Sequence, residues 1–349
     1  MSKSKLTLLI DGNWLMMSRL SVLQARYSDD EKLCKDLKLL MTRSISIVLK
    51  QFPEIDNIIF ISDGGSWRNK IEVPAFLQAE GIEYKGNRER SEDINWEMIF
   101  KAYEDLMQKM KMAGITICKE QNLEGDDWMW WWSTKLNSEG TNCIIWSKDK
   151  DLTQLVNVNK DSCFTVCWNK DSGIITEHKD EEDMDFFFNE AYSENEQLYH
   201  GLLNKVKDVK EIVPKSIIID KIIRGDGGDN ILPIILKKSK SNKDKSFRVS
   251  VKDLDLELDY NDYEEYEAYI INLLNQKKYK GLVDKPLEQI LQHFEYNRQL
   301  VALQKESYPK EILEIFDNYQ DYNVSKNINE VEYQLNAEAN NISQILDFI

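Results

Sequence analysis

The chain has 349 residues, 42% of them hydrophobic, and a formal net charge of −16 at pH 7. This length and apolar content exceed what one usual domain needs, so we expect two domains. The net negative charge by itself argues against a nucleic-acid partner, because phosphate binding depends on Lys and Arg. A local basic surface would nevertheless be enough to bind phosphate.

The first half of the chain alternates short apolar runs with amphipathic stretches. The runs predict buried strands at Leu6–Ile10, Ile58–Ser62, Ile115–Cys118 and Cys143–Ser147. The amphipathic stretches predict helices at Glu31–Lys50 and Trp96–Met112. This order is typical of an α/β fold with a central, mostly parallel sheet flanked by helices.

Two further features follow along the chain. The runs Phe164–Trp168 and Gly173–Thr176 predict a hairpin at the sheet edge. From Ser216 onward the pattern is mainly helical, with a lysine-rich, Ser/Asn-rich loop. We therefore expect one domain over 1–212 and a helical C-terminal domain over 213–349.

Cysteine spacing and the N-terminus bear on the compartment. The five cysteines show no Cys-x-x-Cys spacing, which favours a reducing cytoplasm. The apolar run Leu6–Ile10 is too short for a signal peptide or a membrane helix, so we expect a soluble protein without a membrane partner.

Carboxylates recur in five short clusters, and most of these clusters follow a predicted strand. They are Asp11; Asp63; Glu124, Asp126 and Asp127; Asp149 and Asp151; and Asp226 and Asp229. The carboxyl ends of parallel strands converge on one crevice, so acids distant in sequence can become neighbours. Two unit charges about 5 Å apart repel by roughly 3 kcal/mol at an effective dielectric near 20. The pattern therefore predicts bound cations and metal-dependent phosphoryl transfer.

Each cluster also has a purely structural interpretation. Asp11 and Asp63 suit turns or helix caps, and the acids of Glu124–Asp127 suit the first turn of a helix. In a continuous helix, Glu124 and Asp126 would point in different directions, so we expect Glu124 in the turn before the helix. Trp128, Trp131 and Trp132 lie at helical spacing, and we expect them to be buried rather than stacked on bases.

The motifs Leu9-Ile10-Asp11-Gly12-Asn13, Ile61-Ser62-Asp63, Leu123-Glu124-Gly125-Asp126-Asp127, Ser147–Leu155 and Gly225–Asn230 occur in this order. Together they resemble the 5′ nuclease superfamily of flap endonucleases and 5′-3′ exonucleases. Within it the chain looks most like the ribonuclease H of T-even phages, through Ser66-Trp67-Arg68, Tyr84–Arg88 and Phe294–Arg298.

The resemblance implies two metal ions, normally Mg²⁺, for which Mn²⁺ can substitute. Asp11, Asp63, Glu124, Asp126 and Asp149 would hold the first ion or its waters, and Asp127, Asp151, Asp226 and Asp229 would surround the second. Because Mg²⁺ keeps several waters, many of these acids would act through water. Asp126 and Asp149 are the acids that we expect to be indispensable for catalysis.

The long segment between Asp63 and Glu124 resembles the family's bridge or arch, about residues 64–114, through which a single-stranded 5′ end passes. The resemblance implies that basic residues there contact phosphates: Arg68, Lys70, Lys85, Arg88 and Arg90. Arg68 and Lys85 would be catalytic. The alternative for each is an ordinary solvated surface charge.

The motif Gly225–Asn230 resembles the start of a helix-three-turn-helix that grips duplex DNA. The glycine-rich second half is missing after Asn230, which puts potassium coordination in doubt. Lys237, Lys238 and Lys240 in the following loop would still bind duplex phosphates.

The last residues, including Gln344, Leu346, Phe348 and Ile349, resemble peptides that dock on sliding clamps. The alternative is a terminal helix that packs on its own domain. The expected partners are nicked or branched DNA and RNA·DNA duplex with a 5′ end, a sliding clamp and a single-stranded-DNA-binding protein. We expect a monomer in the cytoplasm, the host's if the chain is phage-encoded.

The predicted function is Mg²⁺-dependent 5′-3′ exonuclease and flap endonuclease activity that removes RNA primers and adjacent DNA from lagging-strand fragments. A PIN-type endoribonuclease and a catalytically silent DNA-structure-binding protein are the alternatives. Asp226, Asp229 and the long bridge argue against the first, and no replaced acid supports the second. A haloacid-dehalogenase-type phosphatase would need an acid where Asn13 stands.

Overall fold

A computed structural model describes residues 5–27, 29–78, 83–87, 94–158, 163–179, 194–237, 245–246, 248–279 and 285–319. The chain divides into two compact units: the first contains residues 1–66, 91–212 and 315–349, and the second contains 67–90 and 213–314. Two segments lie outside the predicted domain pattern, because 67–90 belongs with the C-terminal unit and the chain from residue 315 belongs with the N-terminal one.

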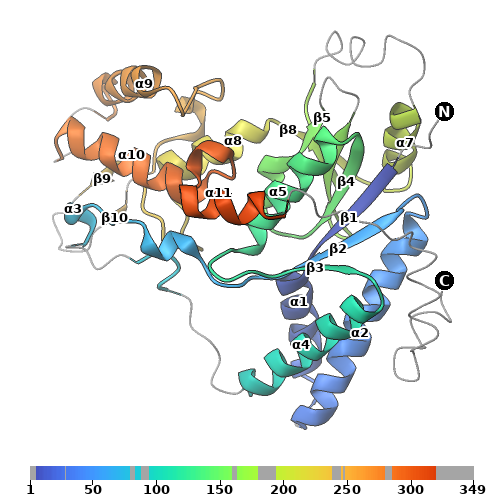
Figure 1. Cartoon of the computed structure of the whole chain (residues 1–349). Helices are drawn as coiled ribbons and strands as arrows, with labels where there is room; N and C mark the ends of the chain where they lie inside the picture. The colour runs from blue at the N-terminus through green and yellow to red at the C-terminus, as the bar shows by residue number, and fades with distance from the viewer. Residues whose placement is uncertain are drawn as a thin grey trace. The chain divides into compact units, whose positions relative to one another are not determined.

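A mostly parallel sheet forms the centre of the first unit (Figure 1). Its strands are β1 (Lys5–Asp11), β2 (Asn57–Ile61), β3 (Thr116–Cys118), β4 (Thr141–Trp146), β5 (Asn157–Val158), β6 (Phe164–Asn169), β7 (Gly173–Glu177) and β8 (Val209–Ile212). The order is β3-β2-β1-β4-β6-β7-β8, with β5 paired to β6. The neighbours β3, β2, β1, β4 and β6 run parallel, and β7 pairs antiparallel with β6, which confirms the predicted hairpin. The hairpin does not lie at the sheet edge, because β8 pairs with the outer side of β7.

The strand order places a topological switch point at β1. The chain adds β2 and β3 on one side of β1 and then returns to place β4 on the other side. Ligands of open α/β sheets bind where the order reverses, outside the carboxyl ends of the strands. Asp11 ends β1, and Asp63 and Asp149 come shortly after β2 and β4, so three predicted site residues flank this point.

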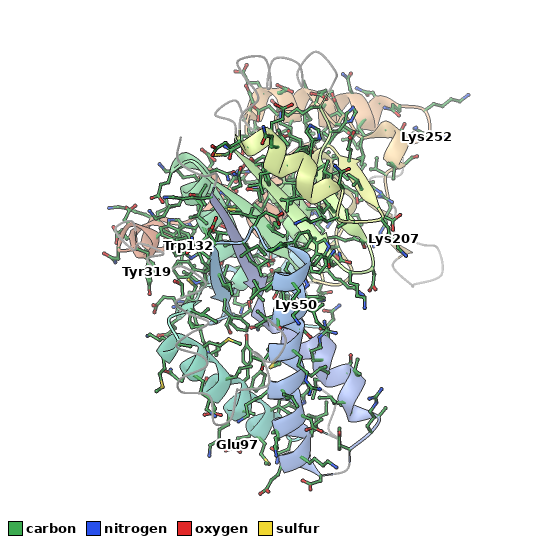
Figure 2. The ribbon with its side chains drawn as sticks, turned by 90° about the vertical axis from the view of Figure 1, so that its right-hand side faces the viewer. Lys50, Glu97, Trp132, Lys207, Lys252 and Tyr319 are labelled. Atoms are coloured by element: carbon green, nitrogen blue, oxygen red, sulfur yellow. The ribbon has the colours of Figure 1, made fainter. Side chains whose placement is uncertain are left out.

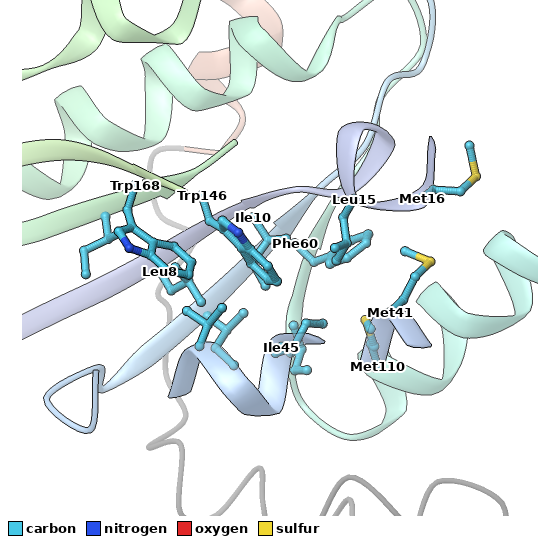
Figure 3. Close-up of a cluster of buried hydrophobic side chains, with 14 of the residues drawn as sticks. Leu8, Ile10, Leu15, Met16, Met41, Ile45, Phe60, Met110, Trp146 and Trp168 are labelled. Carbon is cyan, nitrogen blue, oxygen red and sulfur yellow. The ribbon is translucent and has the colours of Figure 1, made fainter. Parts of the chain in front are cut away.

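Helices cover both faces of the sheet (Figure 1). The helices α1 (Gly12–Gln24), α2 (Asp30–Gln51), α4 (Trp96–Met112) and α7 (Glu194–Leu203) share one hydrophobic core with the strands. Figure 3 shows Ile45 of α2 and Met110 of α4 below Trp146 and Phe60 of the sheet, with Leu15 of α1 beside Phe60. Helix α5 (Gly125–Ser138) covers the opposite face.

Helix α4 lies inside the predicted bridge segment but belongs to the core of the first unit. It buries Ile99, Tyr103, Leu106 and Met110 there. Its N-cap Asn95 accepts the backbone N–H of Met98, and its apolar residues recur at helical spacing. The predicted bridge range of 64–114 therefore includes a helix of the first unit's core, and the bridge itself stays a prediction.

The tryptophans of α5 are core residues, as predicted. Trp128 and Trp132 are fully buried and Trp131 is nearly so. Phe316, in α11 (Lys310–Asp317), stacks on Trp131, and Tyr319 meets Trp128 edge-on. Figure 2 shows Trp132 and Tyr319 on the same side of the molecule. Residues 316–319 thus cover the tryptophans of the helix that begins beside the acids Glu124, Asp126 and Asp127.

The second unit is built mainly of helices. It contains η1 (Trp67–Lys70), α3 (Ala75–Gln78), α8 (Pro214–Arg224), the short strands β9 (Leu236–Lys237) and β10 (Lys245–Ser246), η3 (Val251–Asp253), α9 (Tyr263–Asn275), α10 (Leu287–Val301) and η4 (Lys305–Ser307). Buried side chains of α8, α9 and α10, among them Ile222, Ile270 and Phe294, form its core. None of the described helices in either unit is long and apolar enough to span a membrane.

Candidate functional site

Asp11 caps helix α1 at the end of β1. Its Oδ1 accepts the backbone N–H of Trp14 at 2.8 Å, and its Oδ2 accepts the hydroxyl of Ser147 at 2.7 Å. Burial raises the pKa of Asp11 to about 7; these two hydrogen bonds oppose the rise, while the charges of Asp63 and Asp149 add to it. Strand register pairs Asp11 with Ile61 and Ile10 with Trp146, and Ser147 bonds to both Asp11 and Asp149, so carboxylates from three adjacent strand ends lie near one another.

Asp63 is held by α1 and by α5. Its Oδ2 accepts Nδ2 of Asn13 at 2.6 Å, and its Oδ1 accepts the backbone N–H of Gly125 at 2.6 Å. Oδ1 of Asn13 accepts the backbone N–H of Asp63, the hydroxyl of Ser62 and the hydroxyl of Tyr103. The end of β2, the start of α1 and the N-terminus of α5 are thereby joined at one point.

The N-terminus of α5 carries the third acidic cluster. Helix α5 begins at Gly125, which confirms that Glu124 belongs to the turn before it. Oδ2 of Asp127 accepts the backbone N–H of Glu124 at 2.9 Å, and Asp127 is fully buried. The capping interpretation is therefore confirmed for Asp127, which closes a capping box beside the half-buried Asp126, and the metal role of this cluster stays a prediction.

Asp149 and Asp151 lie in the turn after β4. The backbone N–H of Asp149 donates to Oγ of Ser147, and Oδ1 of Asp149 accepts the N–H of Asp151, which begins the short helix η2 (Asp151–Leu155). Ser147 thus connects this turn to Asp11. Asp149 is exposed and Asp151 half-buried, so both are accessible from solvent.

The gathered acids do not form a preassembled metal site. Within the described ranges, no three His, Cys, Asp or Glu side chains are arranged to hold one metal ion. The contacts above give a reason, since backbone N–H groups and neighbouring side chains occupy oxygens of Asp11, Asp63, Asp127 and Asp149. The arrangement suits a hydrated cation that is bound through water, as Mg²⁺ is in many sites.

Asp226 and Asp229 lie in the second unit, in a tight loop after α8. Gly225 ends the helix with φ +69°, and a Cβ there would meet the carbonyl oxygen of Ile231 at 2.4 Å, so only glycine fits. Asp226 and Ile231 exchange two backbone hydrogen bonds of 2.8 Å that close the loop. Asp226 pairs with Lys221, and Asp229 lies 3.9 Å from Nζ of Lys85.

Electrostatics and packing stabilise this loop. Burial raises the pKa of Asp226, but the hydrogen bond and charge of Lys221 outweigh it, so the pKa lies below its usual value. Nδ2 of Asn297, in α10, donates to the carbonyl oxygens of Ile222 and Leu232, each at 2.8 Å. In the described residues after Asn230 the chain forms β9 rather than a second helix, which agrees with the missing glycine-rich half of the motif.

The predicted basic residues differ in accessibility. Arg68 is only 2% exposed, its Nε donates to the carbonyl oxygen of Leu300 at 2.9 Å, and its guanidinium lies over the Trp67 ring. The alternative of a solvated surface charge therefore does not apply to Arg68, and its catalytic role stays a prediction. Lys70 is exposed and Lys85 is partly exposed.

Several predicted residues lie outside the description. They are Arg88, Arg90, Lys238, Lys240, Gln344, Leu346, Phe348 and Ile349, together with the side chain of Lys237. Conversely, Asn13, Ser147 and Tyr103 are site residues that the sequence did not single out as functional. Asn13 and Ser147 stand inside the acidic motifs, which is a usable signal, whereas nothing in the pattern of α4 distinguishes Tyr103.

The fold, a mostly parallel α/β sheet with carboxylates after its strand ends, is similar to the folds of solved 5′ nucleases. Zinc-bound T5 5′-exonuclease has a similar fold, with a TM-score of 0.53, 14% identity, and coverage of 90% of this chain and 98% of that chain. The bacteriophage T5 flap endonuclease, in a pseudo-enzyme-product complex with DNA and metal ions, gives a TM-score of 0.50, 14% identity and coverage of 94% and 100%.

A family model of the 5′-3′ exonuclease N-terminal, resolvase-like domain matches residues 6–185. The match spans more than half of the chain, so the chain belongs to the 5′-3′ exonuclease family. No curated protein sequence matches it significantly. The solved structures are too distant in sequence to carry more than the fold.

Proposed function

We propose that this protein is a Mg²⁺-dependent 5′-3′ exonuclease and flap endonuclease that removes RNA primers and adjoining DNA, with ribonuclease H activity of the phage type. One observation carries the proposal. Asp11, Asp63 and Asp149 gather beside the N-terminus of α5 at the switch point of the sheet. Family membership supports cleavage from a 5′ end.

The residues present fit hard divalent cations. Carboxylate oxygens are the ligands that Mg²⁺ prefers, and Asp11 has a pKa of about 7, in part because the charges of Asp63 and Asp149 add to the effect of burial. A bound cation would offset the repulsion among these carboxylates and so lower the pKa of Asp11. We infer that Asp11, Asp63, Glu124, Asp126 and Asp149 would hold one ion or its waters, and that Asp127, Asp151, Asp226 and Asp229 would surround a second. Two such ions supply an activated water and stabilise the leaving oxygen.

The chain's own contacts would prepare this site. Asn13 and Gly125 hold both oxygens of Asp63, and Ser147 holds Asp11 while accepting from Asp149. These fixed donors keep the carboxylates in place without a metal, so little reorganisation is needed when the substrate arrives. Lys70 and Lys85 would contact substrate phosphates, together with Arg88, Arg90, Lys237, Lys238 and Lys240.

The proposed substrates are nicked, overhanging or flapped duplexes, both DNA and RNA·DNA, with a free 5′ end. We further infer that the protein acts as a monomer and that its terminal peptide Gln344–Ile349 docks on a sliding clamp. A synthetic peptide of that sequence should bind the cognate clamp, and a scrambled peptide should not. Absence of binding would remove the clamp from the proposal and leave the nuclease unaffected.

The central test compares labelled 5′-RNA, 5′-DNA and flapped duplexes with and without Mg²⁺. Asp149→Asn and Asp126→Asn should abolish release of 5′-terminal products, because each removes a charge that holds the cation. Glu264→Gln, an exposed site in α9, makes the same charge change and should keep the wild-type rate. Equal rates in all variants, or equal rates in EDTA, would refute the proposed mechanism.

A further inference from the structure

Two segments of the second unit that are far apart in sequence form one element. The turn Glu83–Asn87 lies against the loop Gly225–Asn230 and is tied to it by three hydrogen bonds. The backbone N–H of Lys85 donates to the carbonyl oxygen of Asp229 at 2.9 Å, Nδ2 of Asn87 donates to that of Gly227 at 2.9 Å, and Nδ2 of Asn230 donates to that of Glu83 at 2.8 Å. We call this pair of segments the turn–loop element.

Lys85 holds an unusual backbone conformation within this element. Its φ is +56°, in the left-handed region that glycine and asparagine adopt readily and that costs other residues about 1 kcal/mol or more. Glycine would adopt this conformation at little cost, yet the left-handed position falls on Lys85 and not on Gly86, the next residue. A strained residue persists where its surroundings determine its conformation, often at a functional site. The strain at Lys85 therefore indicates that its side chain has a task beyond shaping the turn.

The ammonium group of Lys85 is held from two sides. Its Nζ lies 3.9 Å from Oδ2 of Asp229 and 4.9 Å from the centre of the Tyr84 ring. Tyr84 in turn packs against the hydrophobic core of the second unit. The Lys85 side chain remains 22% exposed, so the cation is both restrained and accessible. A restrained cation loses less side-chain entropy when it contacts a phosphate than a freely moving lysine does.

From these contacts, and resting on the proposed nuclease function, we propose that Asp229 is a positioning residue for Lys85. Its carbonyl oxygen fixes the backbone of the turn, and its carboxylate restrains the ammonium group that contacts a substrate phosphate. The turn–loop element thereby acts as one phosphate-binding unit, and its DNA affinity depends on the pair rather than on Lys85 alone. This role is separate from any contribution of Asp229 to a metal site.

A positioning role and a simple charge effect predict opposite results. An isolated carboxylate beside a phosphate-binding lysine repels the phosphate, so its neutralisation should strengthen DNA binding. If Asp229 positions Lys85, its neutralisation should weaken binding instead. Measurement in EDTA removes every contribution from metal ions.

The experiment measures binding of a fluorescent 5′-overhang duplex to the full chain in EDTA over a range of salt concentrations. Lys85→Met should weaken binding several-fold and reduce the salt slope by about 1, as expected for one lost phosphate contact. Asp229→Asn should also weaken binding several-fold. In the Lys85→Met background Asp229→Asn should have no further effect, because the group that it positions is gone.

Two further variants separate positioning from loss of structure. Lys85→Gly keeps the left-handed turn, so it should leave the thermal unfolding midpoint unchanged or higher while weakening binding as Lys85→Met does. Glu264→Gln makes the same charge change as Asp229→Asn on an exposed part of α9 and should not weaken binding.

The proposal is overturned if Asp229→Asn tightens binding or leaves it unchanged, if its effect adds fully to that of Lys85→Met, or if the wild-type chain binds no DNA. The binding assay contains no cleavage step. Failure of the wild-type chain to release 5′ products with Mg²⁺ would therefore refute the proposed nuclease function without changing the outcome for Asp229.

Discussion

Nδ2 of Asn13 donates to Oδ2 of Asp63 at 2.6 Å and so joins the first turn of α1 to the end of β2. The other side of the amide, Oδ1, accepts from Ser62, Tyr103 and the backbone of Asp63. Asn13 therefore helps to fix the direction of a carboxylate whose Oδ1 is held by the backbone N–H of Gly125.

Replacement of Asn13 should weaken metal use more than folding. We expect Asn13→Ala to raise the Mg²⁺ concentration at half-maximal cleavage by on the order of ten-fold, as loss of partners that orient metal ligands commonly does. Tyr103→Phe removes only one donor to Asn13 and should have a smaller effect. Mg²⁺ titrations of the cleavage rate measure both variants, and an unchanged half-maximal concentration for Asn13→Ala would contradict this role.

Gly12 should be intolerant of any side chain. A Cβ at Gly12 would lie 2.4 Å from the Phe60 ring and from the Tyr103 hydroxyl, inside the core of the first unit. We expect Gly12→Ala to destabilise the fold by about 1–3 kcal/mol, the usual cost of overpacking. Gly201→Ala is the matched control, since a Cβ there meets nothing within 4 Å and it lies in α7. Gly201→Ala should raise the free energy of unfolding by about 0.5–1 kcal/mol. Urea unfolding measures both, and equal shifts would contradict the prediction.

Arg68 should prove important for stability. Its Nε satisfies the carbonyl oxygen of Leu300 at a buried position, so Arg68→Met removes a charged hydrogen bond and leaves that oxygen unpaired. Such losses cost about 1.5–3 kcal/mol. Lys70→Met, in the same short helix but exposed, should change stability by less than about 0.5 kcal/mol.

Cleavage rates of the folded variants then separate the two roles of Arg68. If Arg68→Met were as stable as the wild type but inactive, the guanidinium would act on the substrate and its burial would not describe the working state.

His293 should make the protein sensitive to acid. Burial lowers the pKa of His293 to about 3, and the charge of Lys285 adds to the fall. Below pH about 6.5 the imidazole of His293 binds a proton in the unfolded chain, whereas in the folded chain it stays neutral until the pH approaches 3. Stability from this group is therefore complete above about pH 6.5 and falls by roughly 1.4 kcal/mol per pH unit below it.

Unfolding free energies of the wild type and of His293→Gln between pH 7 and pH 4 test this effect. The difference between the two proteins should shrink as the pH falls, because glutamine does not titrate. Parallel pH profiles would show that His293 is not the group responsible.

The sequence by itself determined the local elements and the acids at the strand ends. The runs Leu6–Ile10 and Ile58–Ser62 and the amphipathic stretches Glu31–Lys50 and Trp96–Met112 became β1, β2, α2 and α4 with shifts of at most a residue. This succeeded because periodicity and β-branched composition are properties of neighbouring residues. The place of Glu124 before α5 followed in the same way from helix geometry.

Only the tertiary structure decided which of these residues meet. Three hydrogen bonds illustrate this. They join Asn13 to Asp63, Arg68 to Leu300 and Lys85 to Asp229, and the paired residues are 50 to 232 positions apart in the sequence. No local pattern records such contacts, because they depend on how packed cores bring remote segments together. The same packing places α4, which lies inside the predicted bridge segment, in the core of the first unit.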